Sequence, residues 1–291
     1  MSINILDNSV LMRLSFGKAG NMRKGDLSEV TISADKDRLK LSKLLFVGPE
    51  YKAIGTFDAL LTAWVNARAV NVETGFKGVS LLPKVLLSAV DIKLEKAKLE
   101  RAELVEQFCT VYADEREQAR ERLDGQFLET DYPPVSEVRE RFAVRWFYVS
   151  IGVADDLPPE LAEKERAKLA ARFDQVADDV QLALRESLRD LVGHLSSRLA
   201  VDADGKKKVF RDSAVGNLTE FLELFSARNI TDDSELSAIA ARAERIIAGV
   251  SPDALRGRGD LRSEVASGLD GVKAAVSALI ETKPGRKFDL G

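Results

Sequence analysis

The chain has 291 residues, of which 45% are hydrophobic and 31% are charged, with only 8 prolines. This composition is typical of an ordered, helix-rich protein with a sizeable core, and it excludes an intrinsically disordered chain. The net charge of −4 excludes a protein whose whole surface coats nucleic acid, although it leaves room for a local basic patch.

Cysteine content and hydropathy predict a cytoplasmic location. The single cysteine, Cys109, cannot form an intramolecular disulfide, which fits a reducing compartment. The first residues lack a basic stretch followed by a long apolar core, so no signal peptide is predicted. The longest apolar runs, such as residues 60–65, are far shorter than a membrane span.

The N-terminal region predicts a β-hairpin followed by helices. Residues 10–16 alternate between apolar and polar side chains and predict a strand. A Gly- and Lys-rich turn follows, and residues 29–34 predict a second strand that pairs with the first. Asp35 or Ser33 is expected to cap a short helix that runs to about residue 47. Further on, we expect a helix over 50–70 and a loop or short strand over 75–83.

Two long helices are predicted around the middle of the chain. From Pro83 to about Asp124 there is a single long helical pattern, which at about 1.5 Å per residue makes a rod of roughly 60 Å. The second, from 157 to about 199, has an apolar stripe suited to packing along another helix. The two suggest an antiparallel pair, a coiled-coil arm or the spine of a bundle. The stripe of the second helix is Leu169, Phe173, Val176, Val180, Leu184, Leu188, Leu191, Leu195 and Leu199.

Between these helices the pattern changes to an aromatic-rich alternation. A short helical turn is expected after Pro133-Pro134, and residues 141–153 then read as a strand. Because this strand has apolar residues on both faces, we expect a central strand that is buried above and below. Its expected partners are the strands of the N-terminal hairpin.

The C-terminal third predicts further helices. The Asp-Gly pair within 201–211 indicates a tight turn, and residues 217–225 form an amphipathic pattern. Asp232 or Thr231 is expected to cap the next helix. The last two helix patterns are 251–255 and about 260–281, before a basic tail.

The fold class expected from these patterns is α+β and predominantly helical. It combines a small antiparallel sheet, two long helices forming a coiled-coil-like arm, and a C-terminal helical region. The regions are 1–82 with the strand 141–153 completing the sheet, 83–200 for the arm, and 201–291, all within one continuous domain.

No catalytic constellation, cofactor motif or metal site is predicted. His194 is the single histidine, and its apolar neighbours favour packing or a rim position on the stripe. Cys109, next to Phe108, is interpreted as a small buried hydrophobe. Phosphate-loop, dinucleotide-binding, HExxH and paired-cysteine motifs do not occur, and GKAG at 17–20 is interpreted as a turn. The acidic pairs Asp155-Asp156, Asp178-Asp179 and Asp232-Asp233 are interpreted as a loop, a solvated helix face and a helix cap rather than as metal ligands.

Two basic clusters could contact nucleic acid or a partner. If both lie together at the base of the long helices, they could follow a phosphate backbone, with Phe16 and Phe210 stacking on bases. The alternative is that both are solvated turns. The clusters are Arg13, Lys18, Arg23 and Lys24 in the first turn region, and Lys206, Lys207, Lys208 and Arg211 after the second long helix.

Four stretches of the chain carry a resemblance to a known family. They are GFKGVSLLP, DYPPVSEVRERFAVRWFYVSIG, GKKKVFRDSAVGNLTEFLELFSARNITDDSEL and PDALR. Together they resemble an uncharacterised family of bacteriophage and mobile-element proteins, domain of unknown function 3150. The resemblance covers roughly residues 10 to 282 and implies genes on phages, plasmids and integrative elements, some near genes for MoxR-type AAA+ ATPases and von Willebrand factor A-type proteins. It implies no catalytic residues.

The leading functional hypothesis is therefore a non-enzymatic interaction or assembly protein of a phage or mobile element, in the cytoplasm of a bacterial host cell. Its long helices would serve self-association, as a homo-oligomer, or docking of a partner such as a MoxR-type ATPase. The alternative is a protein that binds single-stranded DNA during phage replication or recombination. A metal-dependent nuclease is the third class. No cofactor and no membrane contact are expected.

Overall fold

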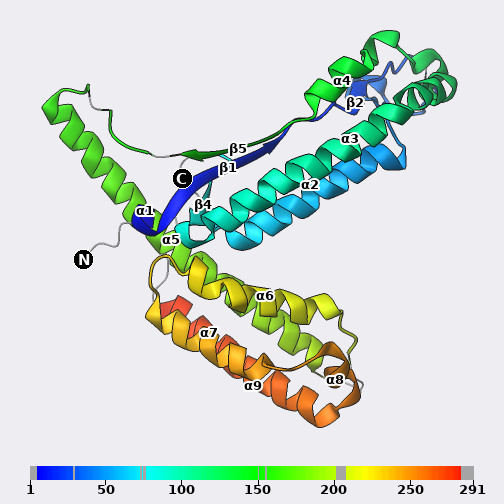
Figure 1. Ribbon diagram of the computed structural model, residues 1–291. Helices are drawn as coiled ribbons and strands as arrows, with labels where there is room; N and C mark the ends of the chain where they lie inside the picture. The colour runs from blue at the N-terminus through cyan, green and yellow to red at the C-terminus, as the bar shows by residue number, and fades with distance from the viewer. Residues whose placement is uncertain are drawn as a thin grey trace. The chain divides into compact units, whose positions relative to one another are not determined.

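The computed structural model of the protein describes most of the chain, and Figure 1 shows the order of its elements. The chain forms two compact units, each with its own cluster of buried apolar residues. Unit 1 comprises residues 1–13, 66–87 and 148–291, and unit 2 comprises residues 14–65 and 88–147. The described residues are 5–28, 30–72, 74, 77–149, 151–154, 156–200 and 208–282.

The fold is α+β and predominantly helical, as expected from the sequence. The described residues form a three-stranded sheet in the order β4-β1-β5 and a two-stranded sheet of β2 and β3. Within the described ranges, no helix combines the length and the apolar character needed to cross a bilayer.

Strand β1 (Ser9–Phe16) lies at the centre of the larger sheet. Its first half pairs antiparallel with β4 (Ser80–Pro83), so that Ser9 lies opposite Pro83. The strand β5 (Val144–Val149) lies on its other side. These three elements confirm the strand at 10–16, the short strand within 75–83 and the sheet position of the aromatic-rich stretch.

Two strand predictions are wrong in detail. β5 is an edge strand rather than a central one, and Phe147 is 55% exposed. Residues 30–34 form no strand, because both edges of β1 already pair with β4 and β5. The hairpin partner strands are instead β2 (Met22–Lys24) and β3 (Ser42–Leu44), with Met22 opposite Leu44.

The segment between β2 and β3 contains one short turn where a helix was predicted. Asp35 caps the 3-10 turn Lys36–Arg38, since its carboxylate accepts a hydrogen bond from the backbone N–H of Asp37. The predicted cap is therefore confirmed, but the helix to residue 47 is wrong because β3 occupies its second half.

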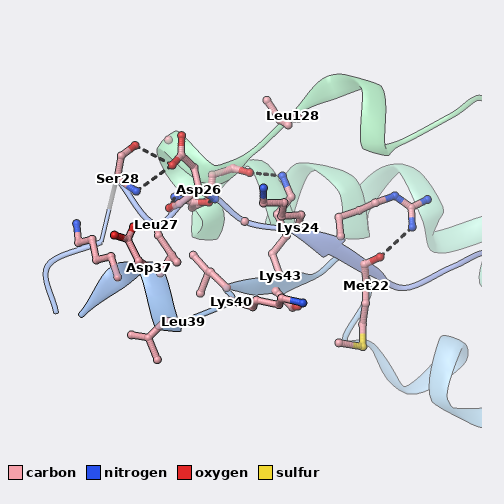
Figure 2. A pocket seen from close by; sticks show the side chains of 17 residues that line it. Met22, Lys24, Asp26, Leu27, Ser28, Asp37, Leu39, Lys40, Lys43 and Leu128 are labelled. Atoms are coloured by element: carbon pink, nitrogen blue, oxygen red, sulfur yellow. Dashed lines mark hydrogen bonds between the residues drawn. The ribbon is translucent and has the colours of Figure 1, made fainter. Parts of the chain in front are cut away.

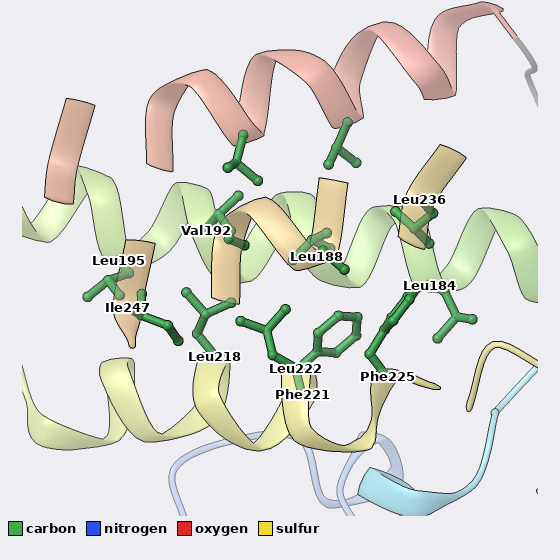
Figure 3. Packing of buried hydrophobic residues seen from close by; sticks show 14 of the residues in the cluster. Leu184, Leu188, Val192, Leu195, Leu218, Phe221, Leu222, Phe225, Leu236 and Ile247 are labelled. Atoms are coloured by element: carbon green, nitrogen blue, oxygen red, sulfur yellow. The ribbon is translucent and has the colours of Figure 1, made fainter. Parts of the chain in front are cut away.

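A bundle of four helices makes up most of unit 1. The longest, α5 (Pro159–Leu199), packs chiefly against α9 (Gly259–Thr282) and also against α6 (Asp212–Arg228) and α7 (Ser234–Ile247). Figure 3 shows the leucines of α5 pointing toward apolar side chains of α6 and α7. The short helices α1 (Ile5–Asn8) and α8 (Pro252–Gly257) complete the described helices of the unit.

The predicted stripe of α5 is the centre of this bundle. Leu169, Phe173 and Leu191 are partly buried, whereas the other stripe residues are buried. Their partners lie within unit 1, so α5 is the spine of a bundle rather than one half of a two-helix arm. The buried members are Val176, Val180, Leu184, Leu188, Leu195 and Leu199.

Two buried arginines fix the ends of the bundle. The Arg262 guanidinium donates hydrogen bonds to the carbonyls of Arg198, Leu199 and Lys208, so it binds the last turn of α5 to α9. Arg185 pairs with Asp233 at 2.7 Å, and both side chains are buried. Asp233 is also the N-cap of α7, one residue after the predicted Asp232.

Unit 2 is built on the other long helix, α3 (Leu87–Leu123), and on most of α2 (Pro49–Arg68). An aromatic cluster including Phe46 and Phe108 joins α2, α3, α4 (Val135–Arg141) and the loop before α2.

A buried ion pair crosses between the two main helices of unit 2. The Arg101 guanidinium of α3 lies 2.6 Å from the Asp58 carboxylate of α2 and donates a second bond to the carbonyl of Gly17. A Cβ at Gly17 would lie 2.4 Å from the carbonyl oxygen of Arg141, so only glycine fits there. The first glycine of the GKAG stretch therefore has a structural role in the packing of unit 2.

We predict that Leu188→Ala lowers the free energy of unfolding by about 2–5 kcal/mol, because it opens a cavity in the bundle. Leu161→Ala in the same helix should cost less than about 1 kcal/mol, since Leu161 is 43% exposed. Urea unfolding of both variants measures the difference. Equal losses would show that the α5 stripe is not packed as described.

Two buried tyrosines of unit 2 make a second matched test. The Tyr132 hydroxyl has no hydrogen-bond partner among the described residues, whereas Tyr112 donates to the carbonyl of Pro133 at 2.7 Å. Tyr112→Phe should therefore cost about 0.5–1.5 kcal/mol, and Tyr132→Phe should cost nothing.

Tyr132 also makes the stability of the fold depend on pH. Burial, with the nearby charge of Asp131, raises the pKa of Tyr132 to about 12 from an ordinary value of 10.0. Because the folded state holds the proton more tightly, its contribution to stability is complete below pH 10 and is lost as pH rises toward 12. Tyr132→Phe should lack this component in unfolding measured across that range.

Candidate functional site

The predicted basic residues belong to two different units. Arg13, Lys208 and Arg211 are exposed residues of unit 1, whereas Lys18, Arg23 and Lys24 belong to unit 2. Neither unit by itself holds the predicted groove. The remaining two members, Lys206 and Lys207, lie outside the described residues.

Several of these residues already have partners within the chain. Lys18 lies 3.4 Å from the carboxylate of Asp58, and Arg23 donates to the carbonyls of Gly20 and Met22. Phe210 is buried beneath the guanidinium groups of two arginines, so the prediction that it stacks on bases is wrong. The Phe16 ring is likewise covered by Arg101, at 5.6 Å.

A basic concavity lies around the β2–β3 hairpin of unit 2. We call it the β2–β3 hollow; its volume is about 1,320 Å³ (Figure 2). Five basic and two acidic side chains line it, in a chain whose net charge is −4. The lining residues are 22–28, 36, 37, 39–43, 125, 126 and 128.

One basic residue of the hollow is structural. Lys43 is buried, lies 2.7 Å from the carboxylate of Asp131 and donates to the carbonyl of Gln126. It therefore holds the turn after α3 against β3. In contrast, Lys24, Lys36 and Lys40 are exposed, and none of them forms an ion pair of 4 Å or less with a described carboxylate.

Hydrogen bonds hold the loop that follows β2. The carboxylate of Asp26 accepts from the backbone N–H of Ser28 at 2.8 Å and from its hydroxyl at 2.7 Å. The Gln126 side chain bonds the N–H and the carbonyl of Asp26. The bonds from Ser28 lower the pKa of Asp26, and the charges of Lys24 and Lys36 lower it further. Sequence reasoning singled out Arg23 and Lys24 of this hollow but missed its other lining residues, because residues 22–43 and 125–128 meet only in the fold.

A second candidate surface is the leading segment of α5, residues 159–175. The helix has 41 residues and its antiparallel neighbour α9 has 24. The Ser196 hydroxyl of α5 donates to Asp270 of α9, which fixes how the two helices are aligned. Because the helices run antiparallel with the same rise per residue, Thr282 at the end of α9 lies near the level of Leu184 in α5. The leading segment therefore extends beyond the described end of α9.

The second half of the leading segment continues the apolar stripe of the bundle through Leu169 and Phe173, and Phe173 packs against the core cluster of unit 1. Leu161 is 43% exposed, Leu169 and Phe173 are partly buried, and Ala162 is the one buried residue in 159–175, all of which are described. Ion pairs within the helix cover its other side, including Lys168 with Glu165 at 2.6 Å. The segment thus presents an incompletely buried apolar face.

The residues considered for catalysis are dispersed. His194 is exposed on α5, which fits the rim position, and Cys109 of unit 2 is partly buried, which raises the pKa of its thiol. Asp233 is used by Arg185 and by the cap of α7. Asp155 lies outside the described residues, which contain no group of three or more histidine, cysteine or acidic side chains arranged to hold a metal.

Comparison of the chain with protein-family models, with curated proteins and with solved structures found no significant match.

The geometry around Asp26 predicts that its carboxyl titrates below its ordinary value of 3.8 in an NMR pH titration. The stabilising effect of the carboxylate on the loop is present above pH 3.8 and is lost as pH falls through the lowered pKa. Ser28→Ala removes one of two hydrogen bonds and should raise this pKa part of the way. Ser42→Ala, in the same hollow, should leave it unchanged; an equal shift in both variants would contradict the assignment.

Proposed function

We propose that the protein is a non-enzymatic assembly protein that self-associates through the leading segment of α5. The observation that carries the proposal is the length of α5 beyond α9, together with the apolar stripe that continues along it. Apolar side chains on a protruding helix are stabilised when a second helix covers them.

The charges of the leading segment favour a second copy as the occupant. Acidic Glu160 and Glu163 stand at its start, and basic Lys168 and Arg172 stand toward its end. When two copies pair antiparallel, the acidic start of each meets the basic end of the other. The segment from Glu160 to Lys168 contains three acids and three bases, so pairing adds no net charge.

The nucleic-acid alternative has weaker support. The residues that motivated it fall in two units, several have partners, and Phe210 is buried. A partner protein, such as the MoxR-type ATPase that the family resemblance suggests, is the other possible occupant of the leading segment.

We expect the purified protein to form a dimer in solution, measured by light scattering over a range of concentrations. Leu169→Glu places a charge in the stripe and should shift the mass to that of the monomer. Ala171→Glu carries the same charge on the exposed opposite side of α5 and should leave the dimer intact. Circular dichroism should show that both variants keep their helices.

A wild-type protein that stays monomeric at every concentration would refute self-association. If that monomer bound a MoxR-type ATPase and Leu169→Glu abolished the binding, the segment would be a docking site for that partner instead. A shift in mass that depends on single-stranded DNA would support the nucleic-acid alternative.

A further inference from the structure

We infer that the β2–β3 hollow of unit 2 binds an acidic peptide segment with interspersed apolar side chains, supplied by a partner protein. The inference does not rest on the proposed function, because the hollow and the leading segment of α5 belong to different units and share no residue.

The size of the hollow favours a peptide over a small metabolite. Pockets for small molecules measure about 300–1,000 Å³ and enclose most of the ligand. At about 1,320 Å³ the hollow exceeds that range. It is bordered by β2, β3, the loop between them and the turn after α3, so a ligand would contact several segments at once.

The charge of the hollow favours an acidic ligand. Lys24, Lys36 and Lys40 come from the end of β2, the 3-10 turn and the residues before β3, and all three are exposed. Arg23 and Lys43 also line the hollow, but they lie 3.7 Å and 2.7 Å from the carboxylate of Asp131. Asp26 and Asp37 offset part of the charge of the three exposed lysines, which keep an excess of one positive charge. Carboxylates spaced along a peptide can approach the lysines while avoiding the two aspartates.

Exposed aliphatic side chains among these charges indicate that the ligand also carries apolar side chains. Met22 is 63% exposed, Leu128 is 53% exposed, and Leu39 is also exposed. Figure 2 shows Leu39 and Leu128 on opposite sides of the hollow, with Lys24 and Lys40 between them. Apolar side chains of a bound peptide would cover them and remove apolar surface from water.

The lining argues for a peptide rather than for single-stranded nucleic acid. Proteins bind single strands by combining a basic groove with aromatic rings on which the bases stack. None of the 17 residues that line the hollow is aromatic, and two are aspartates, which repel phosphates. The aliphatic side chains suit leucine-like residues of a peptide.

The test uses the full-length protein and a fluorescein-labelled peptide of alternating aspartate and leucine, with binding measured by fluorescence anisotropy. The triple variant K24E/K36E/K40E should weaken binding by about tenfold or more, because three attractions become repulsions. The control K52E/K77E/K84E changes the net charge equally at exposed lysines outside the hollow and should bind as the wild type does.

Two further probes separate the apolar and the electrostatic contributions to binding without changing the protein. A peptide with serine in place of leucine should bind more weakly than the original, and added salt should weaken both. Labelled oligothymidylate should bind less well than the acidic peptide.

Three results would overturn the inference: no binding of the acidic peptide at low salt, equal binding by the two triple variants, or tighter binding of oligothymidylate that K24E/K36E/K40E abolishes. The last result would assign the hollow to nucleic acid. Light scattering of Leu169→Glu reports on self-association through α5 alone, whereas fluorescence anisotropy reports on the hollow. Failure of the self-association proposal therefore leaves the peptide-binding inference testable, and the reverse also holds.

Discussion

The apolar stripe of α5 is the constraint on which unit 1 depends. From Val176 to Leu199 its leucines and valines are buried except for the partly buried Leu191, and each buried side chain contributes about 1.5–3 kcal/mol when it leaves water. Helices α6, α7 and α9 supply the covering surfaces, and Arg262 sets where α9 begins along α5. Since α9 is shorter than α5, this register also decides which part of α5 extends beyond α9.

Among the described residues, each unit contains one buried arginine–aspartate pair. Arg185 with Asp233 joins α5 to the start of α7, and Arg101 with Asp58 joins α3 to α2. Removing water from two charges costs several kcal/mol per ion, which the pair recovers only when its hydrogen bonds are well placed. Arg101 donates to both oxygens of Asp58 and to the carbonyl of Gly17. Arg185 donates to Asp233 from its Nε, and a second guanidinium nitrogen lies 2.7 Å from the same carboxylate. The pairs therefore favour one arrangement of their helices over others that would leave a charge unpaired.

The two candidate surfaces differ in chemistry. The leading segment of α5 is an apolar stripe flanked by charges of both signs, which suits a second copy of the same helix. The β2–β3 hollow carries an excess of lysines around aliphatic side chains, which suits an acidic chain of another protein.

The sequence by itself determined the fold class, both long helices, the strand β1 and the stripe of α5, because these depend on local periodicity. It also indicated the cap at Asp35 and the start of a helix at residue 251. Only the tertiary structure decided which elements pack against α5 and which strands pair with β1. The stripe at 176–199 fits any apolar surface, so periodicity could not choose α9 over α3. Likewise the alternation of β5 could not reveal an edge position, since the edge depends on which strands pair with β1. The β2–β3 hollow arises because residues distant in sequence meet around a hairpin that is only three residues long on each strand.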